Sequence, residues 1–444
     1  MVQRVVEDTV EQAALDWFRD LGWDISHGPN ISPGSSSAER ELYSDVVLLN
    51  RLRSALARIN RSIPRDGIEE AVRQIMHEPH PALARNNQHF HQMLTDGITV
   101  EYPDAEGEIK RQIVWAVDFE NPSNNDWLAV NQFTVVGDQE RRPDIVCFIN
   151  GLPIAVIELK NPTDPDATLR SAYNQLQTYK NQISGLFTFN ELLVIADGVE
   201  ARVGSLTSGW DRFMPWRVIE DEKDLRPPLE LELPTLVNGL FEKSRLLSFL
   251  RDFIVFHQSG DDLVKIIAGY HQYHATLEAV DATVYASGEQ GDGRIGVIWH
   301  TQGSGKSLTM VFYARIIALH KEMENPTIVV LTDRQDLDNQ LFATFSDSQD
   351  LLRQTPTQAK ERQGSPRGLR ELLTRDSGGV VFTTVQKFMP SKDEARMPEL
   401  CSRKNLVIIA DEAHRSQYDF IDGFARHLRD ALPNASFIGF TGTP

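Results

Sequence analysis

The sequence predicts an α/β protein with two sheets, a mixed sheet in the N-terminal half and a parallel sheet in the C-terminal half. First, strand-like and helical segments are interspersed between residues 98 and 196. Second, apolar strands alternate regularly with helical segments from residue 261 onward, which is the pattern of a parallel sheet covered on both faces. Third, the acidic, proline-punctuated stretch 226–234 is typical of a linker between two domains.

In the N-terminal half, residues 1–25 carry apolar side chains at helical spacing and reach a helix-stopping glycine at Gly22. The same spacing predicts a helix over 42–59. Further elements follow in order: strands over 98–120, 128–136, 144–149 and 153–160, a helix over 167–184, and a strand over 191–196. We expect this mixed unit to end near residue 225.

Beyond the linker, the amphipathic segment 236–256 predicts a helix that packs between two domains. Apolar strands are then predicted at 296–299, 327–331, 379–382, 406–410 and 436–440. The predicted organisation is therefore a domain over 1–225, a linker and connecting helix over 226–260, and a second domain over 261–444.

The composition excludes several classes of protein. The chain has 444 residues, of which 41% are hydrophobic and 24% charged, so a disordered chain or a fibrous rod is excluded. The 45 basic and 63 acidic residues give a net charge of −18, which argues against coating nucleic acid by bulk charge but not against a local basic groove. Two cysteines and the lack of a long apolar run predict a cytoplasmic protein that does not enter a membrane.

The strongest motif is Thr-Gln-Gly-Ser-Gly-Lys-Ser at 301–307, between an apolar strand and a helix. Glycines let backbone N–H groups converge on phosphate oxygens, a lysine reaches the outer phosphates, and a hydroxyl binds Mg²⁺. The residues that fit a nucleotide in this way are Gly303, Ser304, Gly305, Lys306 and Ser307. His300 stands where the general motif has its first glycine.

An acidic pair, Asp411 and Glu412, follows the predicted strand 406–410. At the carboxyl end of that strand, Asp411 would bind Mg²⁺ through water, and Glu412 would accept a proton from the attacking water as general base. Either residue alone could merely cap a helix. Together with the phosphate loop, the pair predicts ATP and Mg²⁺ as cofactors.

A second group of charged residues lies in the N-terminal half. Asp144 begins one apolar strand, and Glu158 and Lys160 end the next, where strand alternation puts both on one face. Carboxylates that bind Mg²⁺ beside a cation suit metal-dependent phosphodiester cleavage. Charged residues at strand ends are more often simply solvated, so that alternative stays open.

Three segments in the same order resemble motifs of superfamily 2 helicases and translocases: the phosphate loop, the Asp-Glu-Ala-His box at 411–414 and Thr-Gly-Thr-Pro at 441–444. The resemblance implies a RecA-like lobe in which Thr441 and Thr443 couple ATP hydrolysis to movement. It also implies adenine recognition by Gln272 and nucleic-acid backbone contacts from 332–335 and 383–386. The family's motor has two lobes, and the resemblance covers only the first.

The helix after the second charged group carries Gln175 and Tyr179, which resemble the Q-x-x-x-Y element of PD-(D/E)xK nucleases. This resemblance implies a restriction-endonuclease-like domain in which both residues brace the site or contact DNA phosphate. An opening helix with an acidic residue, here Glu7 or Glu11, is also common in these nucleases. An exposed helical glutamate remains an equal alternative for Glu11.

A nuclease followed by a motor lobe resembles the restriction (R) subunit of type I restriction–modification enzymes. The resemblance implies an Mg²⁺-dependent endonuclease and ATP-dependent translocase that acts on double-stranded DNA. It further implies partner modification (methyltransferase) and specificity subunits, and cleavage of unmodified DNA away from the recognition site. Two alternatives remain: another helicase–nuclease of restriction or repair, and a truncated, inactive product whose N-terminal domain only binds DNA or assembles.

Overall fold

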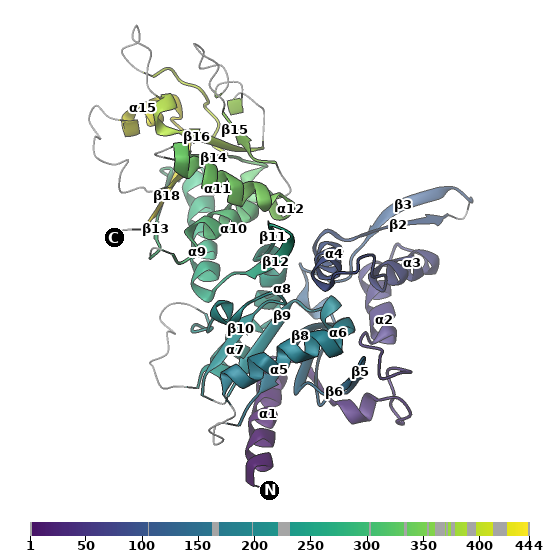
Figure 1. Ribbon diagram of the computed structural model, residues 1–444. Coiled ribbons are helices and arrows are strands. Elements are labelled where there is room, and N and C mark those ends of the chain that lie inside the picture. Colours follow the sequence, from purple (N-terminus) through teal and green to yellow (C-terminus); the bar gives the residue numbers. More distant parts are fainter. Residues whose placement is uncertain are drawn as a thin grey trace. The chain divides into compact units, whose positions relative to one another are not determined.

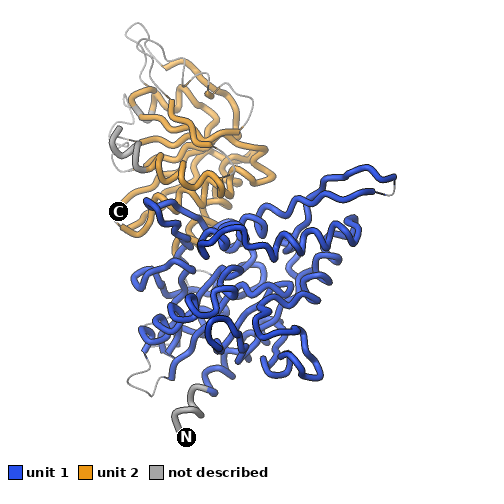
Figure 2. Tube along the Cα trace, turned by 45° about the vertical axis from the view of Figure 1, so that its right-hand side comes forward, with its two compact units in different colours: residues 1–270 blue, residues 271–444 orange. Residues whose placement is uncertain are grey.

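The chain folds into two compact units, residues 1–270 and 271–444, in a computed structural model (Figure 2). The residues that it describes are 2–104, 106–161, 168–197, 199–220, 231–301, 303–332, 335–352, 355–359, 369, 372–373, 378–388, 397–411 and 424–442. The division falls after residue 270, so the segment 261–270, which we expected to open the second domain, lies in the first unit.

The first unit is built on a six-stranded mixed sheet in the order β1-β4-β7-β8-β9-β10. Its strands are β1 (Asp24–His27), β4 (Trp127–Asn131), β7 (Ile145–Ile149), β8 (Leu152–Leu159), β9 (Leu192–Ala196) and β10 (Ala201–Gly204). The pairs β1–β4 and β8–β9 are parallel and the other pairs are antiparallel. The predicted mixed sheet is confirmed.

Every residue of β7, β8 and β9 is buried, which explains why these strands are continuous apolar runs in the sequence. Helix α5 (Leu169–Gln182) lies across one face of the sheet and contacts β8 and β9 (Figure 1). Helix α1 (Val2–Asp20) contacts β1, β4 and β8.

Two predicted elements of this half are wrong in their extent. Residues 42–48 are not helical, and α2 covers only Leu49–Ile59, because the Asp45 carboxylate accepts the backbone N–H groups of Glu41 and Leu42 and forms a local turn. The strand-like segment 98–120 forms a separate hairpin of β2 (Ile98–Pro103) and β3 (Ile109–Val114) outside the main sheet.

Several other elements were not predicted. They include the helices α3 (Arg65–Ile75), α4 (Leu83–Asp96) and α6 (Ser184–Thr188), and the strands β1, β6 (Glu140–Arg141) and β10. The predicted segment 128–136 contains β4 and a second short strand, β5 (Val135–Val136). Strand β5 is separated from β4 and pairs with β6 instead.

The predicted helix over 236–256 is also wrong, since this segment contains two helices and the start of a hairpin. Helix α7 (Glu232–Leu240) is followed by α8 (Lys243–Asp252), and then β11 (Ile254–Ser259) pairs with β12 (Asp262–Ile267). The break between the helices has a clear cause. The Glu242 carboxylate caps α8 by accepting the backbone N–H groups of Ser244 and Arg245.

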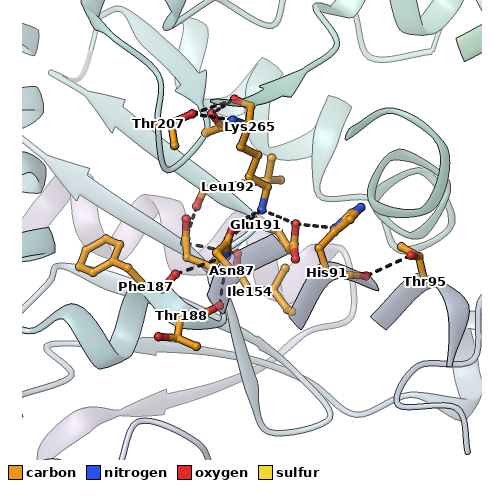
Figure 3. A network of polar contacts seen from close by, with 12 residues as sticks. Asn87, His91, Thr95, Ile154, Phe187, Thr188, Glu191, Leu192, Thr207 and Lys265 are labelled. Carbon is orange, nitrogen blue, oxygen red and sulfur yellow. Dashed lines mark hydrogen bonds and ion pairs between the residues drawn. The ribbon is translucent and has the colours of Figure 1, made fainter. Parts of the chain in front are cut away.

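The β11–β12 hairpin is anchored within the first unit by a buried polar network (Figure 3). The Lys265 ammonium donates to Asn87 Oδ1 at 3.0 Å, to the Asn190 carbonyl at 3.0 Å and to Glu191 Oε2 at 2.5 Å. His91 Nδ1 lies 3.0 Å from the same carboxylate oxygen. Burial lowers the pKa of Lys265, and Glu191 offsets only part of that effect.

The second unit is a six-stranded parallel sheet in the order β13-β18-β17-β14-β16-β15. Its strands are β13 (Arg294–Trp299), β14 (Thr327–Thr332), β15 (Thr357–Gln358), β16 (Val380–Thr384), β17 (Leu406–Asp411) and β18 (Ser436–Thr441). Its described helices of eight or more residues are α9 (Tyr270–Ser287), α10 (Lys306–Leu319), α11 (Gln335–Asp347) and α15 (Phe424–Ala431). The predicted parallel sheet is confirmed.

Side chains of β14 show that this sheet is covered on both faces. Ile328 and Val330 belong to one hydrophobic cluster, whereas Val329 and Leu331 belong to another. Since successive side chains of a strand point to opposite faces, the two clusters lie on opposite sides of the sheet. Across the described part of the chain, no helix combines the length and the apolar character needed to span a membrane.

Candidate nuclease and nucleotide sites

The structure brings Asp144 and Glu158 together at one end of the first sheet. The antiparallel register pairs Ile145 with Ile157, so the next position outward places Asp144 opposite Glu158. The backbone N–H of Leu159 donates to Asp144 Oδ2 at 2.7 Å, which ties the first carboxylate to the strand that carries the second. The expected proximity of the two acidic residues is therefore present.

Lys160 completes this group. Its ammonium donates to Glu158 Oε1 at 2.7 Å and to the Leu159 carbonyl at 3.2 Å. The Lys160 side chain is 12% exposed and the Glu158 side chain 1% exposed, so the cation lies where the buried carboxylate meets solvent. These strand-end charges are not simply solvated.

Gln175 and Tyr179 reach the same place from α5. Gln175 Nε2 donates to Tyr179 Oη at 2.5 Å, as their spacing of one helical turn allows. Burial raises the pKa of the Tyr179 hydroxyl, and the negative charges of Glu158 and Asp144 raise it further. Tyr179 therefore stays protonated near both carboxylates and can donate a hydrogen bond there.

Glu11 of α1 is 9% exposed, which excludes the exposed-glutamate alternative. Its carboxylate accepts hydrogen bonds from the side-chain amides of Asn131, at 2.5 Å, and of Gln132. Gln132 has a φ of 56°, and its backbone N–H donates to the Asp144 carbonyl at 2.9 Å. Glu11 thus supports the backbone beside Asp144, an arrangement that no motif in the sequence indicates. The side chain of Glu7 lies outside the described residues.

The donor set at this site fits Mg²⁺. Magnesium commonly binds one or two carboxylates and keeps several waters, and Asp144 and Glu158 supply two carboxylates from adjacent strands. Oxygen donors without thiolate or imidazole favour such a hard cation over zinc. Among the residues that the structure describes, no cluster of three or more His, Cys, Asp or Glu side chains forms a metal-binding group.

In the second unit, the phosphate loop lies between β13 and α10. Gly303 and Gly305 have φ angles of 84° and 89°, and residues other than glycine rarely adopt such angles. A Cβ atom at Gly305 would also lie 2.8 Å from Gln272 Nε2. Because α10 begins at Lys306, the loop leads directly into a helix N-terminus, where backbone N–H groups bind phosphate.

Lys306 and Asp411 meet at the carboxyl end of the parallel sheet. Lys306 Nζ lies 2.7 Å from Asp411 Oδ1, and the two side chains are 18% and 13% exposed. Carboxyl ends of parallel strands form the ligand-binding edge of such sheets. Ser307 follows Lys306 in the first turn of α10 and is partly buried. The residues present therefore fit a nucleotide with its Mg²⁺.

His300 has a specific function in place of the missing glycine. Ser304 Oγ donates to the Thr301 carbonyl at 2.7 Å, so the proton between His300 Nδ1 and Ser304 Oγ, 2.9 Å apart, belongs to the imidazole. Burial, with His271 and Lys306 nearby, lowers the pKa of His300 to about 4. The neutral ring therefore braces the loop from within.

The start of α9 supports the loop from behind. The Gln272 amide donates to the Gly305 carbonyl at 3.1 Å and to Thr309 Oγ1 at 3.2 Å, and Gln272 is 5% exposed. His271 Nε2 lies 3.3 Å from the Ser304 carbonyl. Sequence reasoning singled out Gln272 but missed His271, whose only signal is that it adjoins Gln272.

The remaining predicted residues have mixed outcomes. The Thr441 carbonyl accepts the His300 N–H at 3.0 Å, which places the end of β18 beside the loop. Thr332 and Thr383 are each 1% exposed, so neither side chain is open to nucleic acid as it stands. Among the described side chains of 332–335 and 383–386, the two segments expected to contact nucleic acid, only Gln386 is exposed. Glu412 and Thr443 lie outside the described residues.

Both units match known families. Residues 4–212 match the family described as the type I restriction enzyme R protein N terminus, and residues 271–444 match SWI2/SNF2 ATPases. The type I restriction enzyme HindI endonuclease subunit of Haemophilus influenzae is 46% identical over 99% of this chain and 42% of its own length. A putative type I restriction enzyme endonuclease subunit, MjaIXP of Methanocaldococcus jannaschii, is 38% identical over 98% of this chain and 42% of its own.

The chain thus spans less than half the length of these relatives. Among solved structures, T4 UvsW is 18% identical over a match that covers 43% of this chain and 32% of the UvsW chain. Its TM-score of 0.27 is too low to define a shared fold. With family matches in both units and relatives aligned along nearly all of it, the chain belongs to the R proteins of type I restriction enzymes.

Proposed function

We propose that the first unit cuts duplex DNA and that the second unit is the first ATPase lobe of a DNA translocase. The observation that supports the nuclease best is the placement of Asp144 opposite Glu158, with the Lys160 ammonium 2.7 Å from the second carboxylate. Buried carboxylates beside a partly exposed cation are suited to phosphodiester hydrolysis.

In this proposal Asp144 and Glu158 bind Mg²⁺, which supplies Lewis-acid activation of the scissile phosphate when bound. Lys160 orients the attacking water and balances the charge that develops on the phosphate oxygens. Tyr179, held protonated by its surroundings, donates a hydrogen bond to a neighbouring phosphate and is itself positioned by Gln175. Glu11 keeps the backbone at Asp144 in place through Gln132.

In the second unit, backbone N–H groups from Gly303 to Ser307 bind the phosphates of ATP, and Lys306 leaves Asp411 for the outer phosphates. Asp411 and Ser307 would then hold Mg²⁺, and Glu412 would act as general base. Gln272 would contact adenine once its amide leaves Gly305 and Thr309, and Thr441 and Thr443 would couple hydrolysis to movement. The complete enzyme joins modification (methyltransferase) and specificity subunits in the cytoplasm and cuts unmodified DNA away from its recognition site.

The test uses Asp144→Asn and Lys160→Ala in the complete endonuclease subunit that carries these residues, assembled with its partners. We expect each change to abolish DNA cleavage, by at least 100-fold, while DNA-stimulated ATP hydrolysis stays within twofold. Lys110→Ala, which removes an exposed lysine from the β2–β3 hairpin, is the matched control and should leave both activities unchanged. Cleavage at the normal rate by Asp144→Asn would refute the nuclease assignment.

A further inference from the structure

A cluster of stacked cationic and aromatic side chains lies on the first unit, beside the candidate nuclease site. The guanidinium groups of Arg170 and Arg202 lie over the ring of Trp210, with their central carbons 4.9 and 5.3 Å from its centroid. Tyr173 packs edge-on against Trp210, with the ring centroids 5.7 Å apart. Two arginines that would otherwise repel each other are thus held on one aromatic ring.

The sheet register relates this cluster to the candidate nuclease residues. Glu158 of β8 pairs with Ile195 of β9, and Ile195 pairs with Arg202 of β10. Directly paired residues of adjacent strands point to the same face, so Arg202 and Glu158 share one face of the sheet. Strands lie about 4.8 Å apart, which places Arg202 about 10 Å from Glu158 along this row.

Helix α5 connects the same two places. Its Tyr179 lies near Glu158, and its Tyr173 packs on Trp210. The two tyrosines are six residues apart, which is about 9 Å along a helix. The strand register and the length of α5 therefore give similar distances between the arginine cluster and the carboxylates.

Both arginines are available to a ligand. Arg170 is exposed and makes no ion pair with any residue that the structure describes. Arg202 is 31% exposed and pairs at 3.1 Å with Glu200, whose side chain is 52% exposed. Exposed pairs of this kind contribute little to stability, so a phosphate can readily replace Glu200.

We propose that Arg170 and Arg202, positioned by Trp210, bind the phosphate backbone of the DNA strand that enters the nuclease site. Guanidinium groups donate paired hydrogen bonds to phosphate oxygens, and ring stacking fixes their orientation beforehand. A separation of about 10 Å corresponds to roughly three base-pair steps of 3.4 Å along the axis of a duplex. The inference rests on the proposed function, because it takes Asp144 and Glu158 as the cutting site.

The test compares DNA binding by the 444-residue chain and its Arg170→Gln/Arg202→Gln variant. The affinity for a fluorescein-labelled 30-base-pair duplex is measured by anisotropy in EDTA, at several salt concentrations. We expect the variant to bind at least tenfold more weakly at low salt, with a slope of log K against log salt smaller by about 2, one for each lost phosphate contact. Any contribution of the second unit is common to both proteins.

The matched control is Arg61→Gln/Arg65→Gln, which removes two exposed charges near the α2–α3 turn and should change the slope by much less. Equal slopes for the two double variants would overturn the inference, since bulk charge would then explain the binding.

Cleavage by the Asp144→Asn subunit separates the two proposals. If Asp144→Asn still cuts, the nuclease assignment fails, whereas an unchanged slope with cleavage lost in Asp144→Asn defeats only this inference.

Discussion

Two lysine–glutamate pairs of the first unit have the same chemistry and different surroundings. Lys265 and Glu191 lie 2.5 Å apart with both side chains fully buried, and the ammonium has three acceptors. Lys160 and Glu158 lie 2.7 Å apart, but Lys160 is partly exposed and its two acceptors belong to adjacent residues of its own strand. The first pair holds separate elements together, whereas the second pair joins nothing distant.

The difference separates a structural ion pair from a reactive one. Burial alone would raise the pKa of Glu191, but Lys265 and His91 outweigh it and hold that pKa below its usual range. The Glu191 carboxylate therefore stays charged between Lys265 and His91. Lys160 reaches solvent, so a water or a phosphate oxygen can share its ammonium.

Lys265→Met should destabilise the first unit strongly. The change leaves the Glu191 carboxylate buried without its main counter-charge, which should lower the free energy of unfolding by about 3 kcal/mol or more. Urea unfolding followed by tryptophan fluorescence measures this. Adding Glu191→Gln should recover part of the loss. If Lys265→Met alone were as stable as the wild type, the Lys265–Glu191 pair would have no structural role.

Lys160→Met should lower the free energy of unfolding by less than Lys265→Met does, because Lys160 lies at the solvent edge of the site, and it should leave no detectable cleavage in the complete subunit. Its partner Glu158 lies two residues earlier in the chain, so no contact between separate elements is lost. The same urea titration checks the stability. A loss as large as that of Lys265→Met would mean that the two pairs do not differ in kind.

The smallest effect concerns the third lysine pair, Lys306–Asp411 in the second unit. Burial is the largest cause of the low pKa of His300, so Lys306→Met should raise that pKa only partly from its value of about 4 toward 6.5. Histidine NMR signals followed against pH measure the change. An unchanged pKa would place Lys306 too far from His300 to act on it.

The pH dependence of stability follows from the same shift. Because the pKa of His300 is lowered in the folded state, the unfolded chain binds the proton first as the pH falls. The folded state therefore loses stability as the pH falls from about 6.5 to about 4. Lys306→Met should narrow this pH range, because it raises the folded-state pKa of His300.

Local patterns predicted much of the fold and the candidate sites. The apolar run before Glu158 and the glycine spacing before Lys306 locate a buried strand and a phosphate loop because each depends on adjacent residues. The Lys265–Glu191 pair could not be predicted, since 74 positions separate its members. The positive φ of Gln132, which brings Glu11 to the backbone beside Asp144, likewise depends on tertiary contacts.

If Asp144 and Glu158 bind a divalent metal ion, calorimetric titration of the nucleotide-free chain with Mn²⁺ should detect the binding. We predict one binding event that Asp144→Asn weakens at least tenfold, since it removes one of two carboxylate ligands. The control Asp104→Asn, at a partly buried carboxylate in the turn between β2 and β3, should leave the affinity unchanged. Mn²⁺ binding that is equally tight in the wild type and in Asp144→Asn would rule out a metal site formed by Asp144 and Glu158.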